Sequence, residues 1–140
     1  MKYTTVGFSS WEKQFIQDVL DDPRAWNVKF VCSASPNLVV YKATGEEIDS
    51  LYPSLKGLSV CDRSSTPTRI YIRSENWNQI PKASGYESLQ GYRIYLICHE
   101  FGHALGHGHS RCVKPGPCPV MVQQTLGTGL CYPHPWVVKT

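Results

Sequence analysis

The sequence lacks any apolar run long enough to cross a membrane. Its longest uninterrupted apolar stretch is Ile94–Cys98, far short of the ~18 residues that a membrane-spanning helix needs. The first residues, Met1–Thr5, contain no apolar segment, so we expect no signal peptide within this chain. We therefore expect neither a membrane span nor a membrane partner.

The sequence also lacks clustered charge and sequence repeats. It has 14 Lys and Arg against 11 Asp and Glu, for a net charge of +3, and no run of basic residues, which argues against nucleic-acid binding. No three- or seven-residue repeat is present, which excludes collagen and coiled coil. With 41% hydrophobic and 18% charged residues in 140, the composition is that of a folded globular protein. We expect one domain over residues 1–140, and a monomer.

Cysteine, by contrast, is abundant. An even number in a chain of this length favours three disulfides and an oxidising compartment, so we expect a secreted or otherwise extracytoplasmic protein. A set of buried reduced thiols is the alternative. No two cysteines have the spacing of a zinc knuckle, so we do not expect them to bind zinc. The six are Cys32, Cys61, Cys98, Cys112, Cys118 and Cys131.

Local patterns predict two long helices and a small sheet. Ser9 and Glu12 form a capping box at the start of a helix over residues 9–21, which has one apolar stripe. A second helix over residues 88–105 ends at Gly106, where glycine accommodates a left-handed backbone. Residues 44–68 are predicted to be loop with one helical turn at most. The predicted strands are Val28–Val31, Leu38–Tyr41 and Arg69–Arg73.

Four of the five histidines lie between residues 99 and 109, in the second predicted helix and just beyond it. The segment HEFGHALGHGH fits H-E-x-x-H-x-x-G-x-x-H, the zinc signature of the metzincin metallopeptidases. This signature fixes five positions at fixed spacing, and here they fall on a predicted helix and just beyond its end. We therefore expect a single zinc ion as cofactor.

The spacing explains which histidines can share one ion. His99 and His103 project from one helix face, about 6 Å apart along the axis, and can converge on one zinc. His107 would stand about 12 Å from His99 on a continuing helix, which is too far. A turn at Gly106 can instead return the chain and deliver His109 as the third ligand. Three imidazoles leave the fourth zinc position for water.

Glu100 argues for a catalytic rather than a structural zinc. It adjoins His99 in sequence and can act as general base on a zinc-activated water that attacks a carbonyl carbon. A structural site would close the fourth position and needs no such carboxylate. Met121 is one of only two methionines, and we expect its thioether to form an apolar floor beneath the ligands, as in the methionine turn of metzincins. His107 and His134 are expected to be surface or supporting side chains.

The stretch from His99 to Ser110 closely resembles the motif of the matrix metalloproteinases. A larger part of the chain is similar to a family of secreted zinc peptidases best known from actinobacteria and described mainly as a domain of unknown function. That similarity implies His99, His103 and His109 as zinc ligands and Glu100 as base. It is carried by Ala34–Pro36, the region of Trp77, Tyr92–Arg93, the histidine motif, Val120–Gly127, Cys131 and Pro135–Trp136.

The resemblance also implies a fold and a set of disulfides. The fold is a compact metzincin-like α+β domain, with a small twisted sheet, a backing helix, the active-site helix and a disulfide-bound C-terminal part. Cys112 is implied to pair with Cys131. Beside that pair we expect Cys98–Cys118 and Cys32–Cys61.

As in metzincins, we expect the substrate to lie extended along an edge strand. The candidate strand is Arg69–Arg73, with Ile70 and Tyr71 as substrate-binding residues. Residues Gln123 to Gly129, with Gln123 and Gln124 foremost, are expected to shape the pocket beyond the scissile bond.

Three functions remain open on the sequence alone. The first is a zinc-dependent endopeptidase acting on a protein or peptide substrate. The second is a zinc amidase acting on peptidoglycan or small amides. The third is an inactive, zinc-bound binding module.

Overall fold

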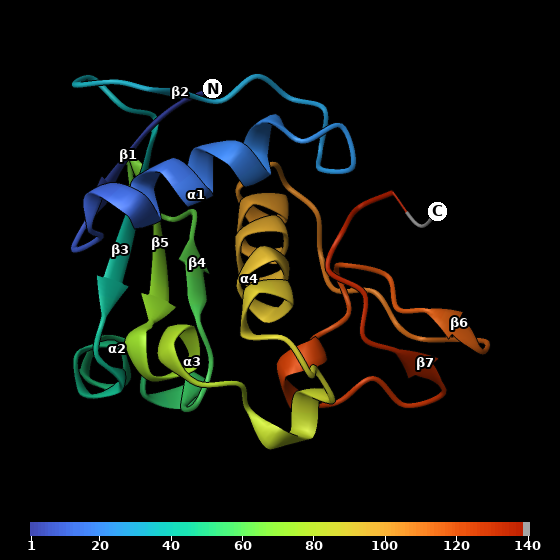
Figure 1. Ribbon diagram of the computed structural model, residues 1–140. Coiled ribbons are helices and arrows are strands. Elements are labelled where there is room, and N and C mark those ends of the chain that lie inside the picture. The colour runs from blue at the N-terminus through green and yellow to red at the C-terminus, as the bar shows by residue number, and fades with distance from the viewer. Residues whose placement is uncertain (139–140) are drawn as a thin grey trace.

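A computed structural model describes residues 1–138 and confirms the predicted α+β class (Figure 1). A five-stranded sheet has the order β2-β1-β3-β5-β4, in which only β4 runs antiparallel to its neighbour. A separate pair, β6 and β7, lies in the C-terminal part. The strands are β1 (Lys2–Val6), β2 (Val31–Cys32), β3 (Leu38–Ala43), β4 (Val60–Asp62), β5 (Thr68–Arg73), β6 (Gly116–Pro117) and β7 (Cys131–Tyr132).

Two long helices accompany the sheet, and Figure 1 shows α4 beside β4, between the sheet and the C-terminal part. The helices are α1 (Ser10–Asp21), α2 (Gly45–Leu51), α3 (Ser74–Asn78) and α4 (Leu89–Ala104), with 3₁₀ turns η1 (Pro53–Leu55), η2 (Lys82–Ser84) and η3 (Gln124–Leu126). The prediction of one domain over residues 1–140 includes residues 139 and 140, which lie outside the described residues.

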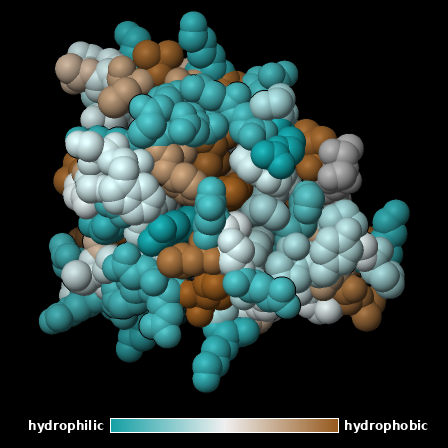
Figure 2. All heavy atoms as spheres, viewed as in Figure 1, coloured by the Kyte–Doolittle hydropathy of each residue, from teal (hydrophilic) through white to brown (hydrophobic). Residues whose placement is uncertain are grey.

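The main core lies between the sheet and the helices α1 and α4. Alternate residues of the central strands, such as Val40 and Ile70, point into it and are fully buried, as expected of side chains two apart on one face of a strand. On the opposite face Tyr41 and Tyr71 stack with ring centroids 4.9 Å apart. Polar residues cover most of the outer surface seen in Figure 2, where apolar residues form separate patches.

The start of α1 is fixed by the predicted capping box. The Ser9 side chain accepts a hydrogen bond from the Glu12 backbone N–H, and the Glu12 carboxylate accepts one from the Ser9 N–H at 2.8 Å. The same carboxylate also accepts hydrogen bonds from Trp77 Nε1 at 2.6 Å and Lys42 Nζ at 3.0 Å. Glu12 therefore ties α1 to β3 and α3.

Glu12 should make the fold sensitive to acid. Burial works to raise the pKa of Glu12, but the hydrogen bonds from Ser9, Lys42 and Trp77 hold this pKa below its usual value. A lowered folded-state pKa gives stability that is present above the unfolded pKa of about 4.3 and lost as pH falls through the folded value. We expect the free energy of unfolding, measured in urea, to drop between about pH 5 and pH 3, the range that spans the unfolded and folded pKa values of Glu12. A Glu12→Gln variant should show a smaller drop, and an equal drop would contradict this assignment.

Several predicted elements need correction. The predicted strand Val28–Val31 contributes only Val31 to β2, and the N-terminal strand β1 was missed. Residues 44–68 were predicted to be loop with one helical turn at most, but they contain α2, η1 and the strand β4. The predicted edge strand Arg69–Arg73 falls within β5, which is paired on both sides, by β3 and by β4. It therefore has no open edge for a substrate.

Candidate metal centre

The end of α4 places the first two histidines and turns the chain back. The Gly106 N–H donates to His103 O at 2.9 Å and the His107 N–H to Gly102 O at 3.0 Å. This pair of bonds is the Schellman motif, which needs a left-handed residue just beyond the helix. Gly106 has φ of 99°, a conformation that side chains with a Cβ rarely adopt. The predicted turn at Gly106 is confirmed.

The turn brings His109 back to the two helical histidines. Ligand atoms of His99, His103 and His109 all lie within 4.8 Å of one another. The Nε2 atoms of His103 and His109 are 3.1 Å apart. Neighbouring nitrogens of a tetrahedral zinc site are about 3.3 Å apart, given zinc–nitrogen bonds of about 2.0–2.1 Å. The three imidazoles can therefore hold one ion.

Backbone carbonyls orient two of these rings. His99 Nδ1 donates to Val120 O at 2.8 Å, and His103 Nδ1 donates to His107 O at 2.8 Å. Because a carbonyl can only accept, each Nδ1 carries the proton and each Nε2 keeps its lone pair for a metal. His99 Nε2 is buried and has no hydrogen-bond partner. A buried nitrogen without a partner is costly, and a metal ion would satisfy it.

The protonation states also suit a metal. Burial lowers the pKa of His99 to about 3, and the nearby His103 and His109 add to this effect. Burial likewise lowers the pKa of His103. Both rings are therefore neutral at pH 7, the form of imidazole that binds zinc.

Glu100 is buried beside the histidines. It is 3% exposed, its Oε1 is 4.0 Å from His99 Nε2, and its Oε2 has no hydrogen-bond partner. Burial raises the pKa of Glu100 to about 8. A carboxylate with a raised pKa and an unpaired oxygen can take up and release a proton near neutral pH.

Met121 lies against α4, next to Gly102 in the helical turn that runs from His99 to His103. It is buried in the main core, and a Cβ placed on Gly102 would come within 2.6 Å of its Sδ atom. The Ser110 N–H donates to Met121 O at 2.9 Å and so ties the segment after His109 to the same residue. Gly102 thus permits the helix to pack this closely on Met121.

Trp26 is part of the site and was missed by sequence reasoning. Its indole N–H donates to Cys98 O at 2.7 Å, and its ring stacks on His107 with centroids 4.3 Å apart. His107 is exposed, and its carbonyl orients His103, so Trp26 supports the turn that positions His103. Trp26 lies in an irregular segment 73 residues before His99 in the printed sequence (99 − 26), and no spacing rule could have found it.

A cavity of about 440 Å³ opens beside these residues. Strand β4 and the segment before it form one wall, and the end of α4 with the following loop forms the other. The lining residues are Leu55, Leu58, Ser59, Val60, Cys61, Arg63, Glu100, His103, Gly106, His107, Gly108, His109 and Gln123.

The predicted substrate-binding residues divide into one that faces the cavity and three that do not. Gln123 lines it, and its Nε2 is 3.4 Å from His109 Nε2. Ile70 and Tyr71 are buried in β5 on opposite faces of the sheet, so neither can contact a substrate. Gln124 is also fully buried.

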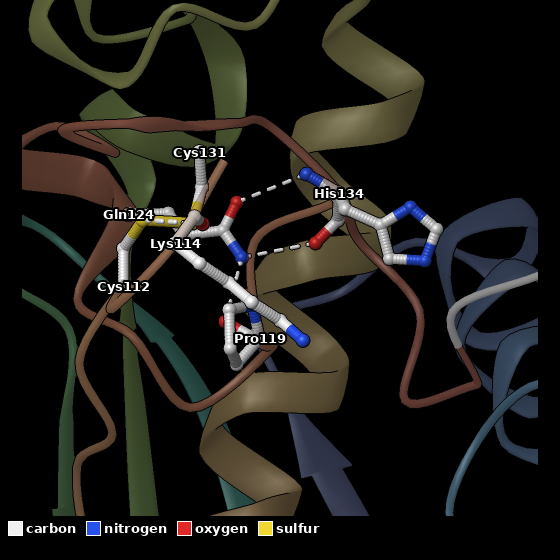
Figure 3. Close-up of a disulfide and its surroundings, with 6 residues drawn as sticks. All are labelled: Cys112, Lys114, Pro119, Gln124, Cys131 and His134. Atoms are coloured by element: carbon white, nitrogen blue, oxygen red, sulfur yellow. Dashed lines mark hydrogen bonds between the residues drawn. A yellow bond between two sulfur atoms is a disulfide. The ribbon is translucent and has the colours of Figure 1, made fainter. Parts of the chain in front are cut away.

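Gln124 holds the C-terminal part together instead. Its side-chain amide donates to Pro119 O at 3.1 Å and to His134 O at 2.9 Å, and its Oε1 accepts from the His134 N–H at 3.2 Å (Figure 3). Both polar atoms of the Gln124 side chain are therefore hydrogen-bonded within the protein, and neither is free to bind a substrate.

The disulfide prediction is correct for one pair. Cys112 and Cys131 are bonded (Figure 3). Cys32 and Cys61 are thiols on β2 and β4. These strands are the two opposite edges of the sheet, about 19 Å apart by strand spacing, whereas disulfide Cα atoms lie about 4.4–6.8 Å apart.

The prediction of a Cys98–Cys118 bond is also wrong. Cys98 carries a thiol inside the main core, whereas Cys118 packs in a separate small cluster with Val122 and the disulfide. The two residues therefore belong to different packing units.

Comparison with known proteins gives one match. No curated protein and no solved structure matches the chain. A family model described as "Protein of unknown function (DUF3152)" matches residues 2–130, a range that includes the three histidines, Glu100, Met121 and Trp26. The chain therefore belongs to the DUF3152 family.

Proposed function

We propose that this protein is a zinc-dependent endopeptidase with a metzincin-like active site. The observation that carries the proposal is the convergence of three histidines, two of them with Nε2 freed by a carbonyl on Nδ1, beside the buried carboxylate of Glu100. The H-E-x-x-H-x-x-G-x-x-H spacing and the methionine packed under α4 agree with the resemblance to metzincins.

The chemistry needs few groups. A zinc ion held by His99, His103 and His109 would supply a Lewis acid that polarises the scissile carbonyl and lowers the pKa of a water molecule. Glu100 accepts a proton from the attacking water at a carboxylate oxygen and delivers it to the leaving amine. Burial raises the pKa of Glu100 toward neutrality, and a pKa near the working pH suits a group that must accept a proton in one step and give it up in the next.

We assign substrate alignment to β4 rather than to β5. Strand β4 is the edge strand on the side of the cavity, and Val60 and Cys61 line that cavity. An extended peptide can pair with an open strand edge through backbone hydrogen bonds. Such pairing recognises main chain, which suits an enzyme that cleaves proteins.

We also propose an extracytoplasmic location. The Cys112–Cys131 disulfide supports an oxidising compartment. Among residues 1–138, no helix combines the length and apolar character needed to cross a membrane.

The test is metal analysis combined with a protein-digestion assay. The purified protein should contain about one zinc per chain and should digest an unfolded protein such as reduced casein. A zinc chelator should abolish digestion, and added zinc should restore it. Cleavage of peptidoglycan or small amides without cleavage of casein would indicate an amidase instead. Stoichiometric zinc without any hydrolysis would leave only a binding module.

A further inference from the structure

The cavity beside the metal centre is electrically asymmetric. Of its lining residues, only Arg63 carries a side chain with a fixed positive charge. The lining residues that precede Cys61 in sequence are mostly apolar, namely Leu55, Leu58 and Val60. The single carboxylate in the lining, Glu100, is buried. A substrate in this cavity thus meets a cation on one side and an apolar surface on the other.

Arg63 is exposed and has no ion-pair partner within residues 1–138. Its neighbour Asp62 is engaged elsewhere, because its Oδ2 accepts from the Tyr52 hydroxyl and its Oδ1 accepts from the Ser64 N–H at 2.9 Å. These bonds fix the turn after β4. The positive charge of Arg63 therefore remains available to a bound molecule.

The guanidinium of Arg63 lies close to the metal-binding loop. Its Nη1 would be 3.6 Å from a Cβ placed on Gly106, the residue at which the chain turns toward His109. Arg63 directly follows β4, and a strand advances about 3.3 Å per residue. Consider a peptide that is aligned with β4 and whose scissile bond lies at Glu100. One of its side chains then lies next to Arg63, and that side chain belongs to a residue one to three positions from the scissile bond (roughly 3–10 Å along the strand).

We infer that Arg63 determines specificity and that the preferred substrates carry a carboxylate beside the scissile bond, on the side where β4 ends. On the other side of the scissile bond, the preferred substrates carry apolar residues, which pack against Leu58 and Val60. This inference rests on the proposed function. An arginine pairs with a carboxylate through two parallel hydrogen bonds, which lysine cannot reproduce.

Matched fluorogenic peptides test this inference. They differ only in Glu, Gln or Lys at each position near the scissile bond, and amidated C-termini separate a side-chain carboxylate from a terminal one. For the zinc-loaded wild-type protein we expect kcat/KM to favour Glu over Gln at one position by about fivefold, the size of an exposed ion pair, and less at high salt. Arg63→Glu should reverse the preference toward Lys, and Arg63→Lys should retain part of it.

The control is Lys13→Glu, which makes the same change in net charge on exposed α1, outside the cavity. Binding of the uncut peptides to a Glu100→Gln variant, followed by fluorescence anisotropy, gives a second measurement that does not need hydrolysis. Equal kcat/KM for all peptides, equal binding, or a Glu preference that survives Arg63→Glu would overturn the inference. If no peptide is cleaved but binding still favours Glu and depends on Arg63, the proposed function is contradicted and the inference about Arg63 stands.

Discussion

A Glu100→Gln variant is expected to lose peptide hydrolysis by about two to four orders of magnitude, the usual contribution of a general acid–base residue. Glutamine has nearly the same shape but cannot accept a proton from water. Zinc content should stay unchanged, because Glu100 is not one of the three histidines that we propose as zinc ligands. Steady-state kinetics on a fluorogenic peptide, together with metal analysis of the same sample, measure both quantities.

Glu87→Gln is the matched control, since Glu87 is exposed just before α4 and lies outside the cavity. It should retain full activity and full zinc content. A Glu100→Gln enzyme that binds zinc and still cleaves at the wild-type rate would remove Glu100 from the reaction. Loss of zinc in this variant would instead show that Glu100 supports the ligands.

A Gly102→Ala variant is expected to destabilise the protein and weaken its hold on zinc. The added Cβ would come within 2.6 Å of both Met121 Sδ and Trp26 Cζ2, distances at which neighbours must move. Overpacking of this kind costs roughly 1–3 kcal/mol, and better helix propensity returns about 1 kcal/mol at most. We expect the midpoint of thermal unfolding to fall by about 2–8 °C.

Displacement of Trp26 should also disturb the orientation of His103, because Trp26 stacks on His107 and the His107 carbonyl orients His103. Competition with a chromogenic chelator should therefore report weaker zinc binding. Gly91→Ala in the same helix is the control, since its Cβ would find ordinary contacts at 3.6–3.8 Å, and its stability should equal or exceed that of the wild type. Unchanged unfolding and unchanged zinc affinity for Gly102→Ala would contradict the packing argument.

The sequence predicted best what is determined locally. The capping box at Ser9 and the end of α4 at Gly106 depend on residues within one helical turn, and both are present in the structure. The spacing of His99, His103 and His109 likewise determines that the three side chains converge, once the chain turns at Gly106. The metal centre could therefore be proposed from a single short segment.

Features set by distant parts of the chain were not predicted. Whether Arg69–Arg73 forms an edge depends on β4, a strand too short to have a recognisable pattern. The error in pairing Cys32 with Cys61 has the same origin, because only the strand order shows that they lie on opposite edges. The burial of Gln124 depends on backbone groups of Pro119 and His134, which residue type alone does not reveal.

The bond from His99 to the Val120 carbonyl has a consequence for how the protein is assembled. A nascent chain that ends shortly after His109 would contain every ligand and Glu100, yet it would lack the group that orients His99. Since domains are synthesised from the N-terminus, high-affinity zinc uptake should come late, after the segment around Met121 has emerged and packed. If the proposed function holds, the order of synthesis itself disfavours early capture of the metal and, with it, cleavage of the protein's own unfinished chain.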